Sequence, residues 1–397
     1  MRTCLTIIMV LFFFWQCTER KNINNDFCEV FVPHLVEDDG FTINGVPDSC
    51  DFIKLESKDS ILINFIAEIQ FADSLIFIKD AGSINGSRLL IFDSKGNFKY
   101  KIDESGRENP PLSDISEFYI DEVNDRIGIY NAIEECISEV SYDGKIERVI
   151  SLNEIMEENV GLRSIERVSL VDQSTLLFLC NSDRDGYDMR AYFIDREDIR
   201  VKDTQIENFC NHGVLIASIN NFLRAGNNIF LIAHMNDTLY RYRSDIGIFY
   251  PELVAKIEKE TLSKEKISEI NSMIDNGTAD FRHFQPFSRG IGTVYYTDSH
   301  VLLYTDLNEK QEMYRVLYNY NTGKISKTTL RITDVPKSYR PLIFIGATNE
   351  GFVCPIPAYQ LLEDRNDAFV QNHVQLQRII ANTADDDNPI IAIFYPS

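Results

Sequence analysis

Apolar and polar positions along the chain recur in a strand–turn–strand pattern. The clearest copy has apolar runs at 74–80, 88–93 and 98–102. The segment Ser94-Lys95-Gly96-Asn97 separates the last two runs, and its glycine favours a tight turn between two strands. The pattern therefore predicts an antiparallel unit of short strands, without the periodicity of a helix.

The same pattern returns about six times, at intervals of about 40–50 residues. Further copies occupy 125–152, 175–195, 229–243, 301–324 and 342–395. Repeats of this length, each a four-stranded antiparallel unit, are typical of propeller blades. Because one blade is too thin to bury both of its faces, the blades are expected to stack around an axis.

A ring of blades has to close, and the two ends of the repeat region provide the strands for it. The strand pattern at 51–56 precedes the first full copy, and the strand at 389–395 lacks a complete set of partners. Pairing them removes two unpaired sheet edges. Two amphipathic stretches, 261–275 and 367–380, are predicted as helices that cap a blade. The predicted fold is all-β, a six-bladed β-propeller at 51–397 with an amino-terminal strand closing the last blade and two short helical insertions.

The first residues have the pattern of a secretory signal peptide. Arg2 precedes an apolar run at 5–15, which is shorter than the roughly 20 residues that span a bilayer. We therefore expect a signal peptide at 1–16 and export of the chain. The alternative is an uncleaved signal anchor.

Cys17 stands at the end of this apolar run and is followed at once by polar residues. This arrangement resembles a bacterial lipoprotein signal, in which the cysteine receives a lipid, although Phe14 and Gln16 depart from the usual residues. The prediction is a membrane anchor through lipid on Cys17. Residues 17–50 are then a tether with little structure of its own.

The charge of the chain argues against one class of partner. The formal net charge is −22, from 61 acidic and 39 basic residues. Such a surface repels phosphate backbones, so no nucleic-acid partner is expected. The remaining composition, 44% hydrophobic and 11% aromatic, is that of a folded protein rich in strands.

The cysteines beyond the signal lack the spacing of a metal or redox motif. Cys136, Cys180 and Cys354 lie in apolar runs and are predicted to be small buried side chains. For Cys28 and Cys50 two alternatives stay open, a disulfide in an oxidising compartment or two separate thiols.

Four short motifs, taken in order, resemble one known family. They are Phe52-Ile53-Lys54-Leu55-Glu56, Phe92-Asp93-Ser94-Lys95-Gly96, Asp237-Thr238-Leu239-Tyr240 and Asp387-Asn388-Pro389-Ile390. The chain resembles the six-bladed β-propeller lipoproteins of Gram-negative gut bacteria, whose architecture is related to NHL-repeat propellers. The resemblance implies a propeller fold and an outer-membrane or periplasmic location, but no settled chemistry. Segment 106–111 departs from the Gly-Pro-Gly-Glu stretch that members often carry.

One face of a propeller collects the candidate binding residues. Around the central channel, the loops that lead into each innermost strand meet those that join the second and third strands. Guanidinium groups on such a rim suit carboxylates, so an anionic or carbohydrate ligand is predicted. The alternative is that these cations pair with nearby acidic residues. The rim residues are Arg163, Phe222, Arg282, His283, Tyr339 and Arg340.

A second candidate site is a loop that resembles the start of a calcium-binding loop. Asp183 and Asp185 alternate with other residues before Gly186, which would aim carboxylate oxygens inward. The twelfth position of such a loop is Tyr192 and not glutamate, so the bidentate ligand is missing. No cofactor is predicted apart from calcium at this loop. The alternative is a solvated hairpin loop without a metal.

The choice between an enzyme and a binding module rests on few residues. Some NHL-type propellers are metal-dependent lyases or lactonases, and His212, His234 and His283 are the candidate ligands for such a site. No nucleophile elbow, phosphate-binding glycine loop or His-Glu-x-x-His motif is present. The sequence favours a non-enzymatic, extracytoplasmic recognition module for a small molecule or glycan. The second alternative is an interaction scaffold for another envelope protein.

Overall fold

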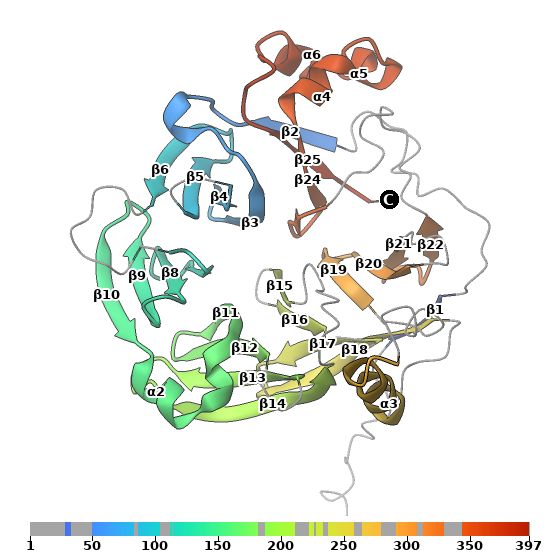
Figure 1. The fold of residues 1–397 in the computed structure, drawn as a ribbon. Coiled ribbons are helices and arrows are strands. Elements are labelled where there is room, and N and C mark those ends of the chain that lie inside the picture. Colours follow the sequence, from blue (N-terminus) through green and yellow to red (C-terminus); the bar gives the residue numbers. More distant parts are fainter. Residues whose placement is uncertain are drawn as a thin grey trace, which may run out of the picture.

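The computed structural model shows a six-bladed β-propeller, as the sequence predicts (Figure 1). Six antiparallel sheets surround one axis, and blade four carries a fifth strand that is parallel to its neighbour. The structure describes residues 28–32, 50–82, 86–103, 112, 114–181, 187–210, 222–225, 228–232, 237–257, 264–278, 291–307, 313–328 and 344–396.

The first three blades follow one another along the chain, each with its first strand at the axis. Blade one contains β3 (Ile66–Ala72), β4 (Leu75–Asp80), β5 (Arg88–Asp93) and β6 (Phe98–Ile102). Blade two contains β7 (Glu117–Asp121), β8 (Arg126–Asn131), β9 (Cys136–Ser141) and β10 (Ile146–Ser151). Blade three contains β11 (Ile165–Asp172), β12 (Thr175–Asn181), β13 (Tyr187–Asp195) and β14 (Val201–Cys210).

The last three blades complete the ring. Blade four contains β15 (Phe222–Ala225), β16 (Asn228–Ile232), β17 (Thr238–Arg243) and β18 (Ile248–Ile257), with β1 (Cys28–Val32) added outside β18. Blade five contains β19 (Ile291–Tyr296), β20 (His300–Leu307), β21 (Met313–Asn319) and β22 (Ile325–Thr328). Blade six contains β23 (Gly346–Ala347), β24 (Phe352–Ile356), β25 (Ile390–Phe394) and β2 (Cys50–Lys54).

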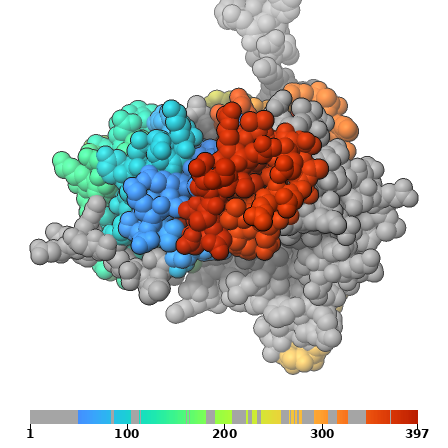
Figure 2. Space-filling view, turned by 90° about the horizontal axis from the view of Figure 1, so that it is seen from above, coloured from blue at the N-terminus to red at the C-terminus, as the bar shows by residue number. Residues whose placement is uncertain are grey.

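The amino-terminal strand β2 closes blade six, as predicted from the strand pattern at 51–56. It pairs antiparallel with β25, and Figure 2 shows the blue segment at the start of the propeller packed against the red carboxy-terminal segment. The side chain of Asn388, 1% exposed, adds hydrogen bonds across this junction. Its amide donates to the backbone oxygen of Glu56 at 2.7 Å, and its oxygen accepts from the backbone N–H of Ile63 at 2.7 Å.

Strand β1 lies inside the segment that the sequence assigns to the tether. It pairs in parallel with β18, with Cys28 opposite Leu253 and Val32 opposite Ile257. The outer edge of blade four would otherwise present unpaired backbone groups, which is the physical reason for a short stretch of the tether to dock there. Cys50 begins β2 in blade six, where it is a buried thiol.

Helices are short additions to the sheets. The first predicted insertion is α3 (Lys264–Asp275), and the second is divided into α5 (Ala368–Asn372) and α6 (Val374–Ile380). The division falls at His373, which has an extended backbone and caps α6 by accepting a hydrogen bond from Leu376 N–H at Nδ1. The helices that the sequence does not predict are α2 (Asn153–Glu158), α4 (Ala358–Glu363) and the 3-10 turns η2 (Asp59–Ile61) and η3 (Val160–Ser164).

Among the described residues, no helix has both the length and the apolar character needed to cross a bilayer.

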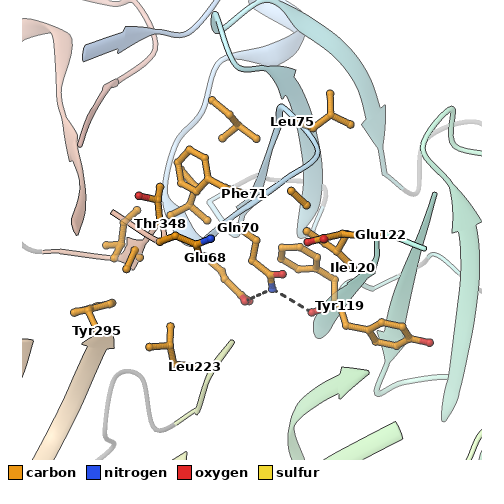
Figure 3. Close-up of a pocket in the computed structure, with 18 of the residues that line it drawn as sticks. Glu68, Gln70, Phe71, Leu75, Tyr119, Ile120, Glu122, Leu223, Tyr295 and Thr348 are labelled. Atoms are coloured by element: carbon orange, nitrogen blue, oxygen red, sulfur yellow. Dashed lines mark hydrogen bonds between the residues drawn. The ribbon is translucent and has the colours of Figure 1, made fainter. Parts of the chain in front are cut away.

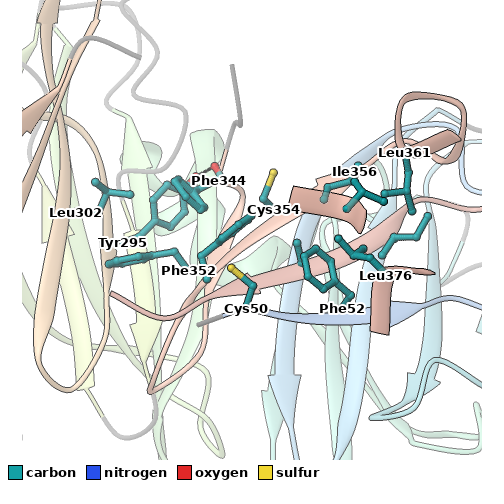
Figure 4. Close-up of a cluster of buried hydrophobic side chains, with 14 of the residues drawn as sticks. Cys50, Phe52, Tyr295, Leu302, Phe344, Phe352, Cys354, Ile356, Leu361 and Leu376 are labelled. Atoms are coloured by element: carbon teal, nitrogen blue, oxygen red, sulfur yellow. Dashed lines mark hydrogen bonds between the residues drawn. The ribbon is translucent and has the colours of Figure 1, made fainter. Parts of the chain in front are cut away.

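The hydrophobic core consists of clusters between neighbouring blades. Each cluster joins buried side chains of two blades, and together they run around the ring. Figure 4 shows the cluster between blades five and six, with Tyr295 and Leu302 beside Phe344 and Phe352 at one end and Phe52 beside Leu376 at the other. Leu361 of α4 and Leu376 of α6 pack into the same cluster, so these helices cap blade six. Each blade therefore buries its two faces by packing one of them against each neighbouring blade.

Candidate functional site

The innermost strands of the six blades surround a cavity of about 600 Å³ on the propeller axis. The strands contribute residues 67–72 of β3, 117–120 of β7, 167–169 of β11, 222–223 of β15, Tyr295 of β19 and 346–347 of β23. Gly346 is required where β23 approaches β3, because a Cβ there would lie 2.8 Å from Cγ2 of Ile69. The cavity has the size and position of a small-molecule site.

The walls of this channel combine apolar and polar side chains. Phe71 lies beside the cavity in Figure 3, whereas the rings of Tyr119 and Tyr295 are each only 2% exposed and pack between blades. The hydroxyl of Tyr295 donates a hydrogen bond to the backbone oxygen of Phe344, so its ring is held in place. Among the described lining residues, the partly exposed rings are those of Phe71 and Phe222, and such rings offer faces for a sugar, an apolar group or a cation.

Charged side chains from blades one, two and three meet in the wall of the channel. Arg167 of β11 donates a hydrogen bond to Oε1 of Glu117, the first residue of β7. The ammonium group of Lys79, from β4, lies 3.7 Å from the same oxygen and donates to the backbone oxygen of Ser116. We call Glu68, Lys79, Glu117 and Arg167 the channel cluster.

Glu68 differs from the other members of the channel cluster in its hydrogen bonding. Its Oε1 accepts a hydrogen bond from Nε2 of Gln70 at 2.7 Å, as Figure 3 shows. Its Oε2 is buried and has no hydrogen-bond partner among the described residues. Because leaving a buried acceptor unpaired costs about 1–3 kcal/mol, this oxygen is suited to receive a donor from a ligand.

The channel cluster shifts the pKa of Glu117 strongly. Burial of the carboxyl group raises the pKa, and the nearby Glu68 carboxylate raises it further. The positive charges of Arg167 and Lys79 oppose these effects. The resulting pKa is about 7 instead of the ordinary 4.5, so Glu117 changes charge close to neutral pH.

Carboxylates outnumber cations along the channel. Among the described lining residues, Arg167 is the one cation, and five residues carry carboxylates: Glu68, Asp73, Glu117, Glu122 and Glu350. Asp73, Glu122 and Glu350 are exposed and lie in the turns after the innermost strands, at the opposite end from the channel cluster. The channel is therefore acidic over its length. Within the part of the chain that the structure describes, no three histidine, cysteine or acidic residues are arranged to hold a metal ion.

Comparison with known proteins then assigns the chain to a family. The sequence profile of a family described as a domain of unknown function, DUF4934, matches residues 30–395. The chain belongs to DUF4934. No curated protein has a sequence that matches it significantly.

Solved structures resemble this DUF4934 protein mainly in fold. A protein from Bacteroides fragilis NCTC 9343, described as exported, is 17% identical over 93% of this chain and 99% of its own, with a TM-score of 0.69. A member of the DUF4221 family from Bacteroides vulgatus ATCC 8482 is 10% identical over 88% of this chain and 98% of its own, with a TM-score of 0.45. The first comparison shows that the propeller fold is shared.

The structure describes only some of the residues that are predicted to form the rim of this DUF4934 protein. Phe222 is the first residue of β15 and lines the channel. Arg163 lies in η3, directly before β11, but the position of its side chain is outside the described part of the chain. The predicted residues that lie outside the described ranges are Arg282, His283, Tyr339, Arg340, the calcium candidates Asp183 and Asp185, the histidines His212 and His234, and the lipidation site Cys17.

The sequence analysis did not predict the channel cluster, because it placed the candidate binding residues in loops, whereas the cluster residues lie in strands. Glu68, Glu117 and Arg167 all lie within the first three residues of an innermost strand. The available signal was a charged residue inside a strand that the repeat places at the axis, where an unpaired charge is costly. That signal identifies positions but does not say which charges meet.

Replacing Glu117 with glutamine is expected to change how the stability of this DUF4934 protein depends on pH. The raised pKa means that the folded state holds this proton more tightly than the unfolded state. The resulting stabilisation is complete below about pH 4.5 and is lost as the pH rises to about 7. The free energy of unfolding of Glu117→Gln, minus that of the wild type, should therefore rise by up to about 3 kcal/mol between about pH 4 and about pH 8.

Urea denaturation of both proteins at a series of pH values measures this difference. Glu154→Gln serves as the control, because Glu154 is exposed on α2 and its removal should leave the pH profile parallel to that of the wild type. A Glu117→Gln profile that is also parallel to the wild type would contradict the raised pKa.

Proposed function

We propose that this DUF4934 protein is an exported binding protein that takes a small organic ligand into its central channel. The signal-peptide pattern at 1–16 supports export, and the structurally similar Bacteroides fragilis protein is itself described as exported. Lipid on Cys17 would anchor the propeller to a membrane, as an outer-membrane or periplasmic lipoprotein.

The observation that carries this proposal is the unpaired Oε2 of Glu68 in the wall of the cavity. A ligand hydroxyl or amino group would satisfy this oxygen with a hydrogen bond to a charged acceptor, which contributes about 1.5–3 kcal/mol. The partly exposed rings of Phe71 and Phe222 in the wall would contact the apolar part of the same ligand. Of the two ligand classes predicted from the sequence, a carbohydrate meets these requirements through its hydroxyl groups.

An anionic ligand fits the described channel less well. It would meet five carboxylates and one guanidinium group, and Arg167 is already paired with Glu117. An anion would depend on the rim cations Arg163, Arg282 and Arg340 at the mouth of the channel, which stay a prediction from the sequence.

The cavity also bears on the alternative of a protein-interaction scaffold. A scaffold needs a flat, aromatic face and no deep polar pocket. The channel instead offers about 600 Å³ with charged groups in its wall, which is typical of a small-molecule site. The geometry therefore supports a ligand receptor better than a scaffold.

Replacing Glu68 with glutamine is expected to weaken ligand binding by tenfold or more. A thermal-shift panel of neutral glycans, uronic acids, amines and short peptides would first identify a binder of the wild-type protein. A ligand at about 100 times its dissociation constant should stabilise the folded state by about 2.7 kcal/mol. In Glu68→Gln the acceptor charge is gone, so about 1.4 kcal/mol or more of this binding energy should disappear.

Glu154→Gln again provides the matched control, because it removes one exposed carboxylate of α2 that is not among the residues lining the channel. It should bind the same compound as tightly as the wild type. The proposal fails if no compound of the panel stabilises the wild type. It fails equally if a binder has the same affinity for Glu68→Gln.

A further inference from the structure

The charge distribution of the channel selects among the donors that could satisfy Glu68. We propose that the channel prefers ligands with a protonated amino group, which binds the Glu68 carboxylate, and that binding of this cation expels a proton from Glu117 to the solvent. This inference rests on the proposed function, since it names the chemistry of the ligand and the regulation of the same site.

Three features of the channel favour an ammonium group over a hydroxyl group. The unpaired acceptor is an oxygen of a carboxylate, and a cation gains more from it than a neutral donor does. Five carboxylates outnumber the one guanidinium group among the described lining residues, so the cavity as a whole attracts positive charge, although Arg167 and Lys79 lie beside Glu117 in its wall. The partly exposed ring of Phe71 lines the same cavity, and aromatic faces attract cations.

Proton release follows from the groups that surround Glu117. They come from four elements: Glu68 of β3, Lys79 of β4, Tyr130 of β8 and Arg167 of β11. Glu68 is the negative charge that keeps the proton on Glu117, whereas Arg167 and Lys79 favour its loss. A ligand cation beside Glu68 offsets that negative charge and adds a positive one. The carboxyl of Glu117 then ionises more readily, and its proton leaves as the ligand binds.

The sign of the pH dependence is set by this exchange. Below the pKa of Glu117, about 7, the free protein carries the proton and the ligand has to displace it. Affinity for an amine should therefore rise as the pH increases to about 7, by at most about tenfold per pH unit, and level off above it. An alkylammonium group stays protonated over this range, like the lysine side chain, so the ligand itself adds no titration.

Probes that share a skeleton and differ in charge test the inference. One set is phenethylamine, phenethyl alcohol and phenylacetate, and a second is pentylamine, pentanol and pentanoate. Calorimetric titration of the full-length folded protein, in buffers of different ionisation enthalpy, gives both the affinity and the number of protons released. The measurements are made on the wild type, Glu68→Gln and Glu117→Gln, at about pH 6 and about pH 8, on either side of the Glu117 pKa.

The expected result is that at least one amine binds the wild type about tenfold or more tightly than its alcohol and its acid. Binding should release roughly half a proton or more at about pH 6 and roughly a tenth or less at about pH 8. Glu68→Gln should lose the preference for the amine. Glu117→Gln should keep the preference but release no proton. Thermal melting of both variants verifies that they are folded.

The inference is overturned if an alcohol or an acid binds the wild type as tightly as its matched amine. It is also overturned if the amine binds without proton release at about pH 6, or if Glu117→Gln still releases a proton. These results would leave the channel as a binding site for another class of ligand. Binding of none of the probes, whatever their charge, would also overturn the inference, whereas the proposed function itself fails only if no compound of the wider panel binds the wild type.

Discussion

Truncation of Phe52 to alanine is expected to lower the free energy of unfolding by about 3–5 kcal/mol. Phe52 is 3% exposed in β2, the strand that closes the ring, and its ring packs edge-on against His373 with centroids 5.1 Å apart. Alanine would leave a cavity in the cluster between blades five and six. It would also weaken the junction that joins the first strand of the propeller to the last.

Chemical denaturation measures this loss as a lower midpoint with an unchanged slope. Phe65→Ala is the matched control, because Phe65 is 62% exposed and its removal should change stability by about 0.5 kcal/mol or less. A Phe52→Ala protein as stable as the control would show that β2 does not hold the ring closed.

Replacement of Arg196 by methionine is expected to destabilise the protein by about 3–5 kcal/mol near neutral pH. Arg196 joins blades two and three from a buried position. Its Nε lies 2.7 Å from Oε1 of Glu139, and its Nη1 lies 2.9 Å from Oδ2 of Asp121. Methionine fills similar volume but leaves two buried carboxylates without this cation, and each is only 1% exposed.

The loss should diminish in acid. Burial opposes ionisation of Asp121, but hydrogen bonds from Asn124, Gln173 and Arg196 outweigh it and lower its pKa. In the wild type, Asp121 therefore contributes stability above its ordinary pKa of 3.8, which is lost as the pH falls further. In Arg196→Met the buried Asp121 loses a hydrogen bond and a positive charge that favour its ionised form, so it is protonated more readily and the deficit relative to the wild type should shrink towards about pH 4.

Arg200→Met is the control for this substitution. Arg200 pairs with Asp198 at 3.1 Å, but both side chains are more than half exposed, at 71% and 58%. Exposed pairs of this kind contribute about 0–1 kcal/mol. Equal effects of Arg196→Met and Arg200→Met in urea denaturation would contradict the structural role assigned to the buried pair.

Most of the strand pattern could be predicted because it is local. Gly96 occupies the predicted turn, Gly144 and Gly323 occupy the equivalent turns of two later copies of the pattern, and all three have positive φ, which glycine adopts without strain. The long insertion was harder to predict, because a single residue, His373, divides it into two helices. The cysteines predicted to be small buried side chains, Cys136, Cys180 and Cys354, are buried.

Only the location of the candidate site could be predicted from the sequence. The repeat indicated a channel on the axis, and Phe222, one of the predicted rim residues, is among the residues that line it. The charges that meet there were not predictable, because Arg167 and Glu117 lie 50 residues apart and belong to different blades. Nothing in the local sequence of either strand indicates that partner.

The sequence by itself determined the all-β class, the repeating blades and the closing strand, since alternation, turns and unpaired edges are properties of short segments and of their number. Only the tertiary structure decided that β1 lies beside β18, that Arg196 bridges two blades, and that Glu68 and Glu117 share one cavity. These features depend on how the blades are rotated and packed around the axis. The charge and hydrogen bonding of a side chain in the channel are then set by neighbours that are distant in sequence.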